Sequence, residues 1–145
     1  MSAYPPISTR PSLKVASALL ASADLPTSDL TDEHCRHFFF LGDPESPTGL
    51  VGLEMLGDVA LLRSLVVTPG ARRSGAGSAL VEHAEGHARR RGVRSLYLLT
   101  TTAEAFFAKR GYARAVRDTA PAAIRATREF AGICPASSAF MCKQL

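Results

Sequence analysis

A glycine-rich segment constrains the fold of this chain more than any other feature: Arg72-Arg73-Ser74-Gly75-Ala76-Gly77. An apolar run from Val59 to Val67 precedes it and reads as a strand. From Gly75 to Arg91, apolar residues recur on one helical face, which predicts an amphipathic helix. Amides at a helix N-terminus are free donors, and the helix dipole favours negative charge there. Because glycines allow close backbone approach and two arginines add charge, the segment predicts an anion-binding loop.

Turn residues divide the rest of the chain into short elements. Gly57-Asp58 suits a type II′ hairpin, and Gly92 and Gly111 are placed to end helices. Besides Val59 to Val67, we expect strands over Ile7 to Thr9, His37 to Leu41, Gly49 to Leu56, Arg94 to Leu99, Tyr112 to Val116 and Ser138 to Lys143. We expect helices over Ser12 to Ser22, Thr31 to Cys35, Gly75 to Arg91, Thr102 to Arg110 and about Pro121 to Ala131. This order predicts a single domain, 1–145, of the α/β (α+β) class around one mixed sheet.

The net charge of +4 is carried mostly by arginine, and nucleic-acid binding is one interpretation of that surplus. The arginines, however, gather at Arg72-Arg73 and at Arg89 to Arg91, without interleaved aromatic residues. A phosphorylated small molecule explains the first group better, and the second lies at a helix C-terminus, where cations are favoured. We therefore expect no nucleic-acid partner.

Neither an apolar run of membrane-spanning length nor a signal-peptide pattern is visible, so we expect a cytoplasmic protein without a membrane partner. The three cysteines, Cys35, Cys134 and Cys142, have no paired metal-like spacing, and we interpret them as free thiols. A soft-metal or metalloid site is the alternative for them.

Three phosphorylated ligands compete for the loop. A nucleoside triphosphate would call for a lysine after the glycines, whereas Ser78 follows Gly77. A nicotinamide dinucleotide would call for three spaced glycines in a βαβ unit, and only two glycines are present. The third ligand, coenzyme A, also carries a pyrophosphate that these amides could hold.

Two motifs carry a resemblance to a known family. The pattern Val-x-Pro-x-x-Arg-x-x-Gly-x-Gly is matched by Val67, Pro69, Arg72, Gly75 and Gly77. Downstream, Phe106-Phe107-Ala108-Lys109-Arg110-Gly111-Tyr112 has two aromatic residues, three further residues, then glycine and an aromatic residue. Together they resemble the GNAT superfamily of acyl-CoA-dependent N-acetyltransferases.

The resemblance implies a fold and a cofactor geometry. The fold is a central, mixed and mostly antiparallel sheet flanked by helices. The strand before the loop would splay from its neighbour and hydrogen-bond the pantetheine arm of acetyl-CoA. The cofactor-binding residues it implies are Leu65, Val66, Val67, Arg72, Arg73, Ser74, Gly75, Ala76, Gly77, Ser78, Thr100 and Phe107. No metal is expected.

Amine acetylation needs a base for the amine and a way for the thiolate to leave. The candidate base is Glu54, which lies on the strand beside the cofactor strand. Its side chain is expected on the opposite face of the sheet from Leu53 and Met55, and His34 and His37 are alternative bases. The family often has a tyrosine acid where this chain has Phe107. Water, Ser64 or a hydroxyl of Thr100-Thr101-Thr102 could replace that tyrosine, or the thiolate could leave unaided.

The acceptor is the least constrained part of the prediction. Arg63 and Ser64 interrupt an apolar strand, and with Arg125 they are candidate substrate-binding residues for an acceptor's acid group. Three parts of the chain look like the GNAT branch named for arsenic-resistance operons: Leu61 to Leu65, Tyr97 to Phe107, and the tail from Ala120 to Ala139. That likeness implies detoxification of a small amino-acid-like amine, with an organoarsenical as one candidate. An ordinary amino acid, a protein amine, or a non-catalytic acyl-CoA sensor are the alternatives, and a homodimer is expected by analogy alone.

Overall fold

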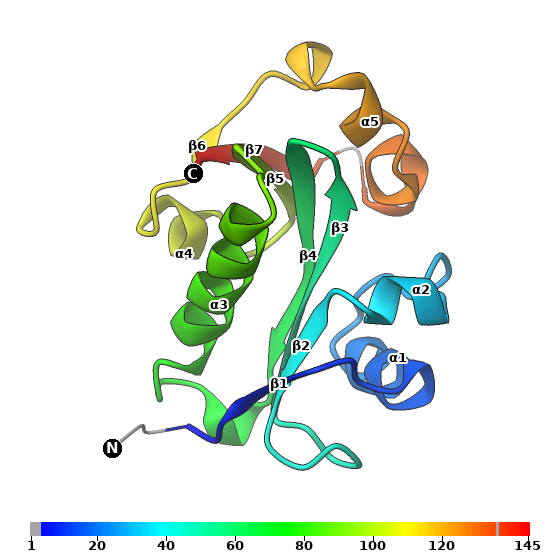
Figure 1. Ribbon diagram of the computed structural model, residues 1–145, viewed down its shortest axis with the longest axis vertical. Helices are drawn as coiled ribbons and strands as arrows, with labels where there is room; N and C mark the ends of the chain where they lie inside the picture. Colours follow the sequence, from blue (N-terminus) through cyan, green and yellow to red (C-terminus); the bar gives the residue numbers. More distant parts are fainter. Residues whose placement is uncertain (1–3, 136) are drawn as a thin grey trace.

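A mixed sheet divides the molecule into two helical layers (Figure 1). In the computed structural model, which describes residues 4–135 and 137–145, the sheet has seven strands in the order β1-β2-β3-β4-β5-β7-β6. The strands are β1 (Ile7–Thr9), β2 (Phe38–Leu41), β3 (Gly49–Leu56), β4 (Val59–Val67), β5 (Ser95–Thr100), β6 (Ala113–Arg114) and β7 (Ala139–Gln144). Neighbours pair antiparallel except β4 and β5, which pair in parallel. The predicted mixed, mostly antiparallel sheet is therefore confirmed.

Helices cover both faces of this sheet. They are α1 (Leu13–Ser22), α2 (Asp32–Cys35), α3 (Ala76–Arg90), α4 (Glu104–Ala108) and α5 (Ala122–Arg125). Figure 1 shows α3 on one face, and α1, α2 and α5 on the other. None of the helices among residues 4–135 and 137–145 is both long and apolar enough to cross a membrane.

Strand β2 shows how the sequence supplies both layers. Its four residues are all buried, and they alternate between the two faces. Phe39 and Leu41 pack in the core beneath α3, whereas Phe38 and Phe40 pack in the core beneath α1. A strand that is apolar on both sides is what a sheet covered on both faces requires.

Capping residues place the helix boundaries where the sequence predicts them. The Ser12 hydroxyl accepts a hydrogen bond from the Val15 amide at 3.1 Å and begins α1. Thr31 caps α2 in the same way, with the His34 ring reaching back to the Thr31 amide at 3.1 Å. Gly92, with φ of +86°, follows the last turn of α3.

The single helix expected over Pro121 to Ala131 is wrong, because the helix is interrupted after α5. The Thr127 hydroxyl donates to the Ile124 carbonyl at 2.7 Å and accepts from the Phe130 amide at 3.3 Å. These bonds end one turn and begin a separate π-helical turn, Glu129–Ile133. The strand expected over Tyr112 to Val116 is also shorter, since β6 covers only Ala113–Arg114. Tyr112 instead lies in the core, where its hydroxyl donates to Glu85 Oε2 at 2.9 Å.

Candidate functional site

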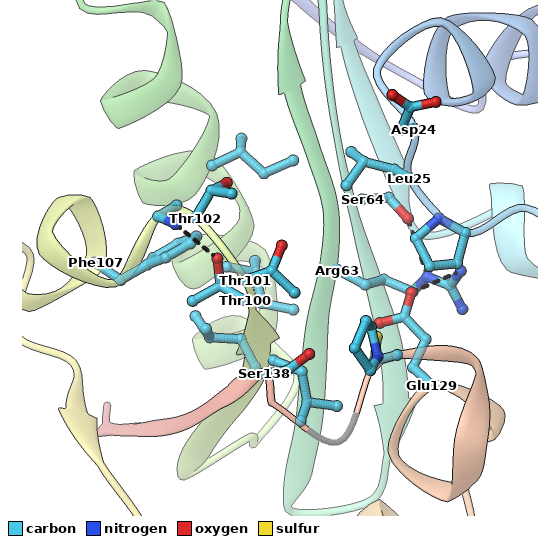
Figure 2. A pocket seen from close by; sticks show the side chains of 18 of the residues that line it. Asp24, Leu25, Arg63, Ser64, Thr100, Thr101, Thr102, Phe107, Glu129 and Ser138 are labelled. Atoms are coloured by element: carbon cyan, nitrogen blue, oxygen red, sulfur yellow. Dashed lines mark hydrogen bonds and ion pairs between the residues drawn. The ribbon is translucent and has the colours of Figure 1, made fainter.

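Strands β4 and β5 pair only briefly, and a cavity opens where their pairing stops. Residues 59–61 pair with residues 95–97, and no pairing continues along the rest of the two strands. A cavity of about 550 Å³ lies beyond, lined by both strand ends, α4 and the segment after α5. We call it the splay cavity. In Figure 2, Thr100, Thr102 and Phe107 lie on one side of it, with Arg63 and Glu129 on the other.

A β-bulge lies in β4 at this cavity. Leu50 pairs with Val66 and Gly52 with Arg63, so one residue of β3 opposes two of β4. One of those two, Ser64, has φ of +60°, in the left-handed region. A bulge leaves ladder groups unpaired and bends its strand. The bulge therefore interrupts the β3–β4 ladder where β4 lines the splay cavity.

The glycine-rich loop forms a second cavity, which we call the anion groove. Arg73 and Gly75 have φ of +68° and +85°, and the first backbone hydrogen bond of α3 joins the Ala79 amide to the Gly75 carbonyl at 3.0 Å. The amides of Gly77 and Ser78 precede that bond and have no intrahelical acceptor. The groove has a volume of about 560 Å³. Its lining includes Leu65, Val66, Val67, Arg72, Arg73, Gly75, Ala76, Gly77 and Ser78.

Ser74 is the one residue of the predicted loop set that does not line this groove. Its hydroxyl donates to the Ala71 carbonyl at 2.6 Å and accepts from the Ala76 amide at 3.3 Å. These bonds join the loop to the first turn of α3. In this structure Ser74 therefore shapes the loop from within.

Three arginines border the anion groove, and the sequence identified two of them, Arg72 and Arg73. Arg72 donates from Nε to the Val67 carbonyl at 3.2 Å, one of the strand groups expected to meet pantetheine. Arg110 donates from Nε to the Ser78 hydroxyl at 2.9 Å, and its guanidinium lies 3.6 Å from the Phe106 ring centroid. The sequence signal for Arg110 was its spacing of four residues from Phe106 at a helix end, which places both on one helix face. The groove thus combines cations with free amides.

The anion groove and the splay cavity adjoin each other. Leu25, Leu65, Thr102 and Ala103 line both of them. Thr100 lies in the splay cavity at the end of β5, and its hydroxyl accepts from the Ala103 amide at 3.0 Å. An extended ligand could therefore place an anionic part on the loop and reach the gap between the strands with its other end.

Phe107 lines the splay cavity as part of an aromatic cluster. It is buried and packs edge-to-face against Phe106 and Tyr112, with ring centroids 5.1 and 5.4 Å apart respectively. The Tyr112 hydroxyl is committed to Glu85 at 2.9 Å. Neither side chain offers the cavity a free phenol.

Arg63 is fully buried and bonded to carboxylates from three separate segments. Its guanidinium contacts Asp29 at 2.5 and 2.9 Å, Glu129 at 3.0 Å and Glu54 at 3.3 Å. Burial alone would lower the pKa of Arg63, but the hydrogen bonds that Arg63 donates to Asp29 and the three negative charges outweigh it and raise that pKa. The guanidinium expected to bind an acceptor's acid group is already occupied by these carboxylates. Its Nε also donates to the Ser64 hydroxyl at 3.0 Å, which ties the cluster to the bulge.

Glu129 is a site residue that the sequence did not reveal. It lines the splay cavity, and its side chain is 5% exposed. Burial raises the pKa of Glu129 to about 7; Arg63 opposes this effect, and the charges of Asp29 and Glu54 add to it. Nothing in the local sequence marks Glu129, because its position depends on the interruption of the helix after α5.

Glu54 lies on the other side of the cluster. Its Oε1 is 2.9 Å from His34 Nε2 and 3.3 Å from Arg63 Nη1. With His34 and His37 it lines a third cavity of about 420 Å³, and it is absent from the lining of the splay cavity. His37 Nδ1 is also 3.4 Å from His87 Nε2. The predicted base and its two histidine alternatives therefore lie together, on the far side of Arg63 from the splay cavity.

One group of side chains has the composition of a cation site. Ligand atoms of Asp29, His34 and Glu54 lie within 4.8 Å of one another. Arg63 Nη1, however, contacts both carboxylates of this group, at 2.5 and 3.3 Å. The guanidinium thus supplies the positive charge that a metal ion would bring.

The remaining candidates lie apart from this cluster or carry unreactive thiols. Arg125 is exposed on α5 and belongs to the lining of none of the three cavities described above. Cys35, Cys134 and Cys142 are free cysteines. Cys134 lines the splay cavity, where burial and the nearby Glu129 raise the pKa of its thiol to about 12. A thiol held protonated in this way is a poor nucleophile at neutral pH.

The fold agrees with comparisons to known proteins. The sequence model of the Acetyltransferase (GNAT) family matches residues 8–112, and the chain belongs to this family. N-acetylglutamate synthase from Neisseria gonorrhoeae, solved with coenzyme A and N-acetyl-glutamate, superimposes with a TM-score of 0.81 at 23% identity. Rv2747 from Mycobacterium tuberculosis, solved with CoA, superimposes with a TM-score of 0.78 at 19% identity. At these identities the likeness shows the fold.

The extent of these matches differs. This chain is covered to 97% by both structures, but it spans 35% of the N-acetylglutamate synthase chain and 99% of Rv2747. An amino-acid acetyltransferase from Ralstonia nicotianae is 38% identical over 63 residues, which are 43% of this chain and 14% of that relative. The chain therefore corresponds to only part of two of these relatives.

Proposed function

We propose that this chain is an N-acetyltransferase that moves the acetyl group of acetyl-CoA to the amine of a small amino-acid-like acceptor. The observation that carries the proposal is that the anion groove adjoins the splay cavity, with four lining residues in common. A ligand with a pyrophosphate, a long flexible arm and a reactive end fits that arrangement. Membership of the acetyltransferase family supports it independently.

In this proposal the pyrophosphate of acetyl-CoA lies on the amides of Arg73 to Ser78, beside Arg72 and Arg110. The fit rests on the free amides of Gly77 and Ser78 and on the open space at Gly75, where an added Cβ would meet nothing within 4 Å. The pantetheine arm runs along Leu65 to Val67 as an added strand. Arg72 releases the Val67 carbonyl, now bonded at 3.2 Å, when the arm binds.

The chemistry takes place in the splay cavity. A neutral amine attacks the thioester carbon, a C–N bond forms, and the C–S bond breaks with its electron pair on sulfur. The nitrogen loses its remaining extra proton, and the amide and the thiol are formed. Since Phe107 has no hydroxyl, the sulfur leaves as a thiolate, whose conjugate acid has a pKa of about 8.5. A carboxylate near Arg63 takes the first proton of the acceptor's ammonium group, and Glu54 is the candidate that the sequence suggests.

The proposed acceptor class rests on the tail and on the partial relative. The relative from Ralstonia nicotianae is named an amino-acid acetyltransferase. The residues from Ala120 to Ala139 resemble the arsenic-resistance branch, which adds an organoarsenical amino acid to the proposed acceptors and detoxification as the proposed role. An ordinary amino acid remains the second candidate.

The test is thiol release from acetyl-CoA across a panel of amines. The panel holds the common L-amino acids, including L-glutamate, with phosphinate and arsenical analogues and a lysine peptide. We expect release with at least one free amino acid, and acetylated product by mass spectrometry. Binding of acetyl-CoA without release for any amine would refute the enzyme and favour an acyl-CoA sensor.

A further inference from the structure

The splay cavity carries an excess of acidic groups where the acceptor's amine must arrive. Among the described residues that line it, Arg63 is the one basic side chain, while Asp24 and Glu129 are acidic. The charge of Arg63 is shared by three carboxylates, at 2.5 to 3.3 Å. A cavity with this balance attracts a cation, and it has no unpaired basic group for an acid.

We propose that Glu129 binds the ammonium group of the acceptor in the splay cavity and takes its proton. This inference rests on the proposed acetyl transfer and adds a residue to it. It moves the base from β3, where the sequence suggested Glu54, to the π-helical turn after α5.

Geometry distinguishes the two carboxylates. Glu129 lines the splay cavity, whereas Glu54 lines the cavity on the other side of Arg63. One guanidinium links Glu129 to the bulge, because Arg63 contacts Glu129 at 3.0 Å and the Ser64 hydroxyl at 3.0 Å. The bulge lies in β4 just beyond Leu61, where the pairing with β5 ends, and in this proposal the thioester meets the strand there. Figure 2 shows Glu129 beside Arg63 and Ser64, which places it near the proposed reaction centre.

The surroundings of Glu129 suit a group that both accepts and releases a proton near neutral pH. The charged groups that face it are Arg63 on β4, Asp29 before α2 and Glu54 on β3, with the Cys134 thiol on its own segment. Burial raises the pKa of Glu129 to about 7, with Arg63 opposing and the two acids adding. A base is most effective when its pKa lies near the working pH. An ammonium group placed beside Glu129 would also relieve the repulsion among the three carboxylates.

The proton balance is as follows. The acceptor's ammonium group gives one proton to the Glu129 carboxylate, and the freed lone pair forms the C–N bond with the thioester carbon. The C–S bond breaks and the sulfur leaves as a thiolate. The second proton lost by nitrogen protonates that thiolate to the thiol. Glu129 then returns its proton to water, so each turnover releases one proton beyond the amide and the thiol.

The kinetic test compares three variants with the wild type, using the panel amine that gives the fastest thiol release. We expect Glu129→Gln to lower kcat/KM at pH 7 by about 100-fold or more. It should also abolish the ionisation near pH 7 in the pH profile. Glu129→Asp, which keeps a carboxylate, should retain that ionisation. Glu54→Gln should retain it as well, with a smaller loss of rate.

A binding measurement tests the same inference without turnover. Wild-type protein carrying [δ-13C]glutamate gives a Glu129 carboxyl resonance, assigned by its absence in Glu129→Gln, and its titration is followed by NMR. Propylammonium chloride should lower the titration midpoint by about one unit relative to equal sodium chloride. An unchanged midpoint overturns the proposal, as does wild-type kcat/KM in Glu129→Gln. Absence of thiol release by the wild type refutes the proposed function instead, and the titration still decides on Glu129.

Discussion

At the scale of single residues, two glycines of the same loop have different reasons to be glycine. Gly75 has φ of +85°, a conformation that residues with a side chain rarely adopt. Gly77 has ordinary backbone angles, but an added Cβ would lie 3.3 Å from the Phe106 ring, at the wall of the anion groove. The first glycine shapes the turn, and the second makes room for the Phe106 ring at the wall of the groove.

Gly77→Glu should abolish acetyl-CoA binding while the protein stays folded. The added carboxylate would lie beside the free amides and repel a pyrophosphate, so we expect affinity to fall at least about 100-fold, or about 3 kcal/mol. Isothermal titration calorimetry with acetyl-CoA measures this change. Gly70→Glu is the matched control, since Gly70 is exposed with open space around it and does not line the groove. An equal loss of acetyl-CoA affinity in both variants would contradict the assignment, because the added charge would then act regardless of where it lies.

At the scale of elements, the bulge in β4 changes the facing of a whole strand. Leu61 packs with α5 and Val66 with α1, on the same side of the sheet. In a regular strand, two residues five positions apart would face opposite sides. Leu62 and Leu65 both pack on the α3 side. An unbroken period of two would send Val66 to the α3 side. The sequence predicts β4 as a strand, but the extra residue at Ser64 becomes visible only through its pairing with β3.

Strand β3 contributes a second constraint on packing, at Gly52. A Cβ added there would lie 2.2 Å from the Phe38 ring of the neighbouring strand. Gly52→Ala should lower the free energy of unfolding by about 2 kcal/mol, because a fully buried ring must shift. Urea unfolding measures this loss, and Phe38→Leu in the same chain should recover part of it.

Gly86→Ala supplies the comparison for this change. It makes the same substitution inside α3, where the contact is the flexible Arg90 side chain, so it should stabilise by about 0.5–1 kcal/mol. An equal effect at both positions would contradict the packing argument.

At the scale of the whole molecule, the Arg63 cluster joins parts of the chain that are distant in sequence. Asp29 precedes α2, Glu54 lies on β3, Arg63 on β4, and Glu129 follows α5. A buried arginine without these partners would be strongly unfavourable. The cluster therefore connects the segments that surround the splay cavity.

The raised pKa of Glu129 predicts how the stability of the molecule depends on pH. The folded state holds the proton more tightly than the unfolded chain, so this contribution is complete below about pH 4.5 and is lost as pH rises to about 7. Glu129→Gln imitates the protonated form at every pH. Relative to the wild type, its free energy of unfolding should increase by about 3 kcal/mol between pH 4.5 and 8. Chemical unfolding at pH 4.5 and pH 8 measures the difference, and a constant difference would show that Glu129 ionises as an ordinary carboxyl.

The sequence by itself determined the parts of this protein that depend on neighbouring residues. Turn glycines, capping residues and apolar periodicity predicted most of the strands and helices, the glycine-rich loop and the family resemblance. They failed at Pro121 to Ala131, where the Thr127 hydroxyl competes with the helix for backbone partners. Tertiary structure alone decided that Arg63 is enclosed by acids, that Glu54 lies beyond it, and that Arg110 and Glu129 line the two cavities. These outcomes depend on contacts between residues separated by up to 66 positions, such as Arg63 and Glu129, and no local pattern records such contacts.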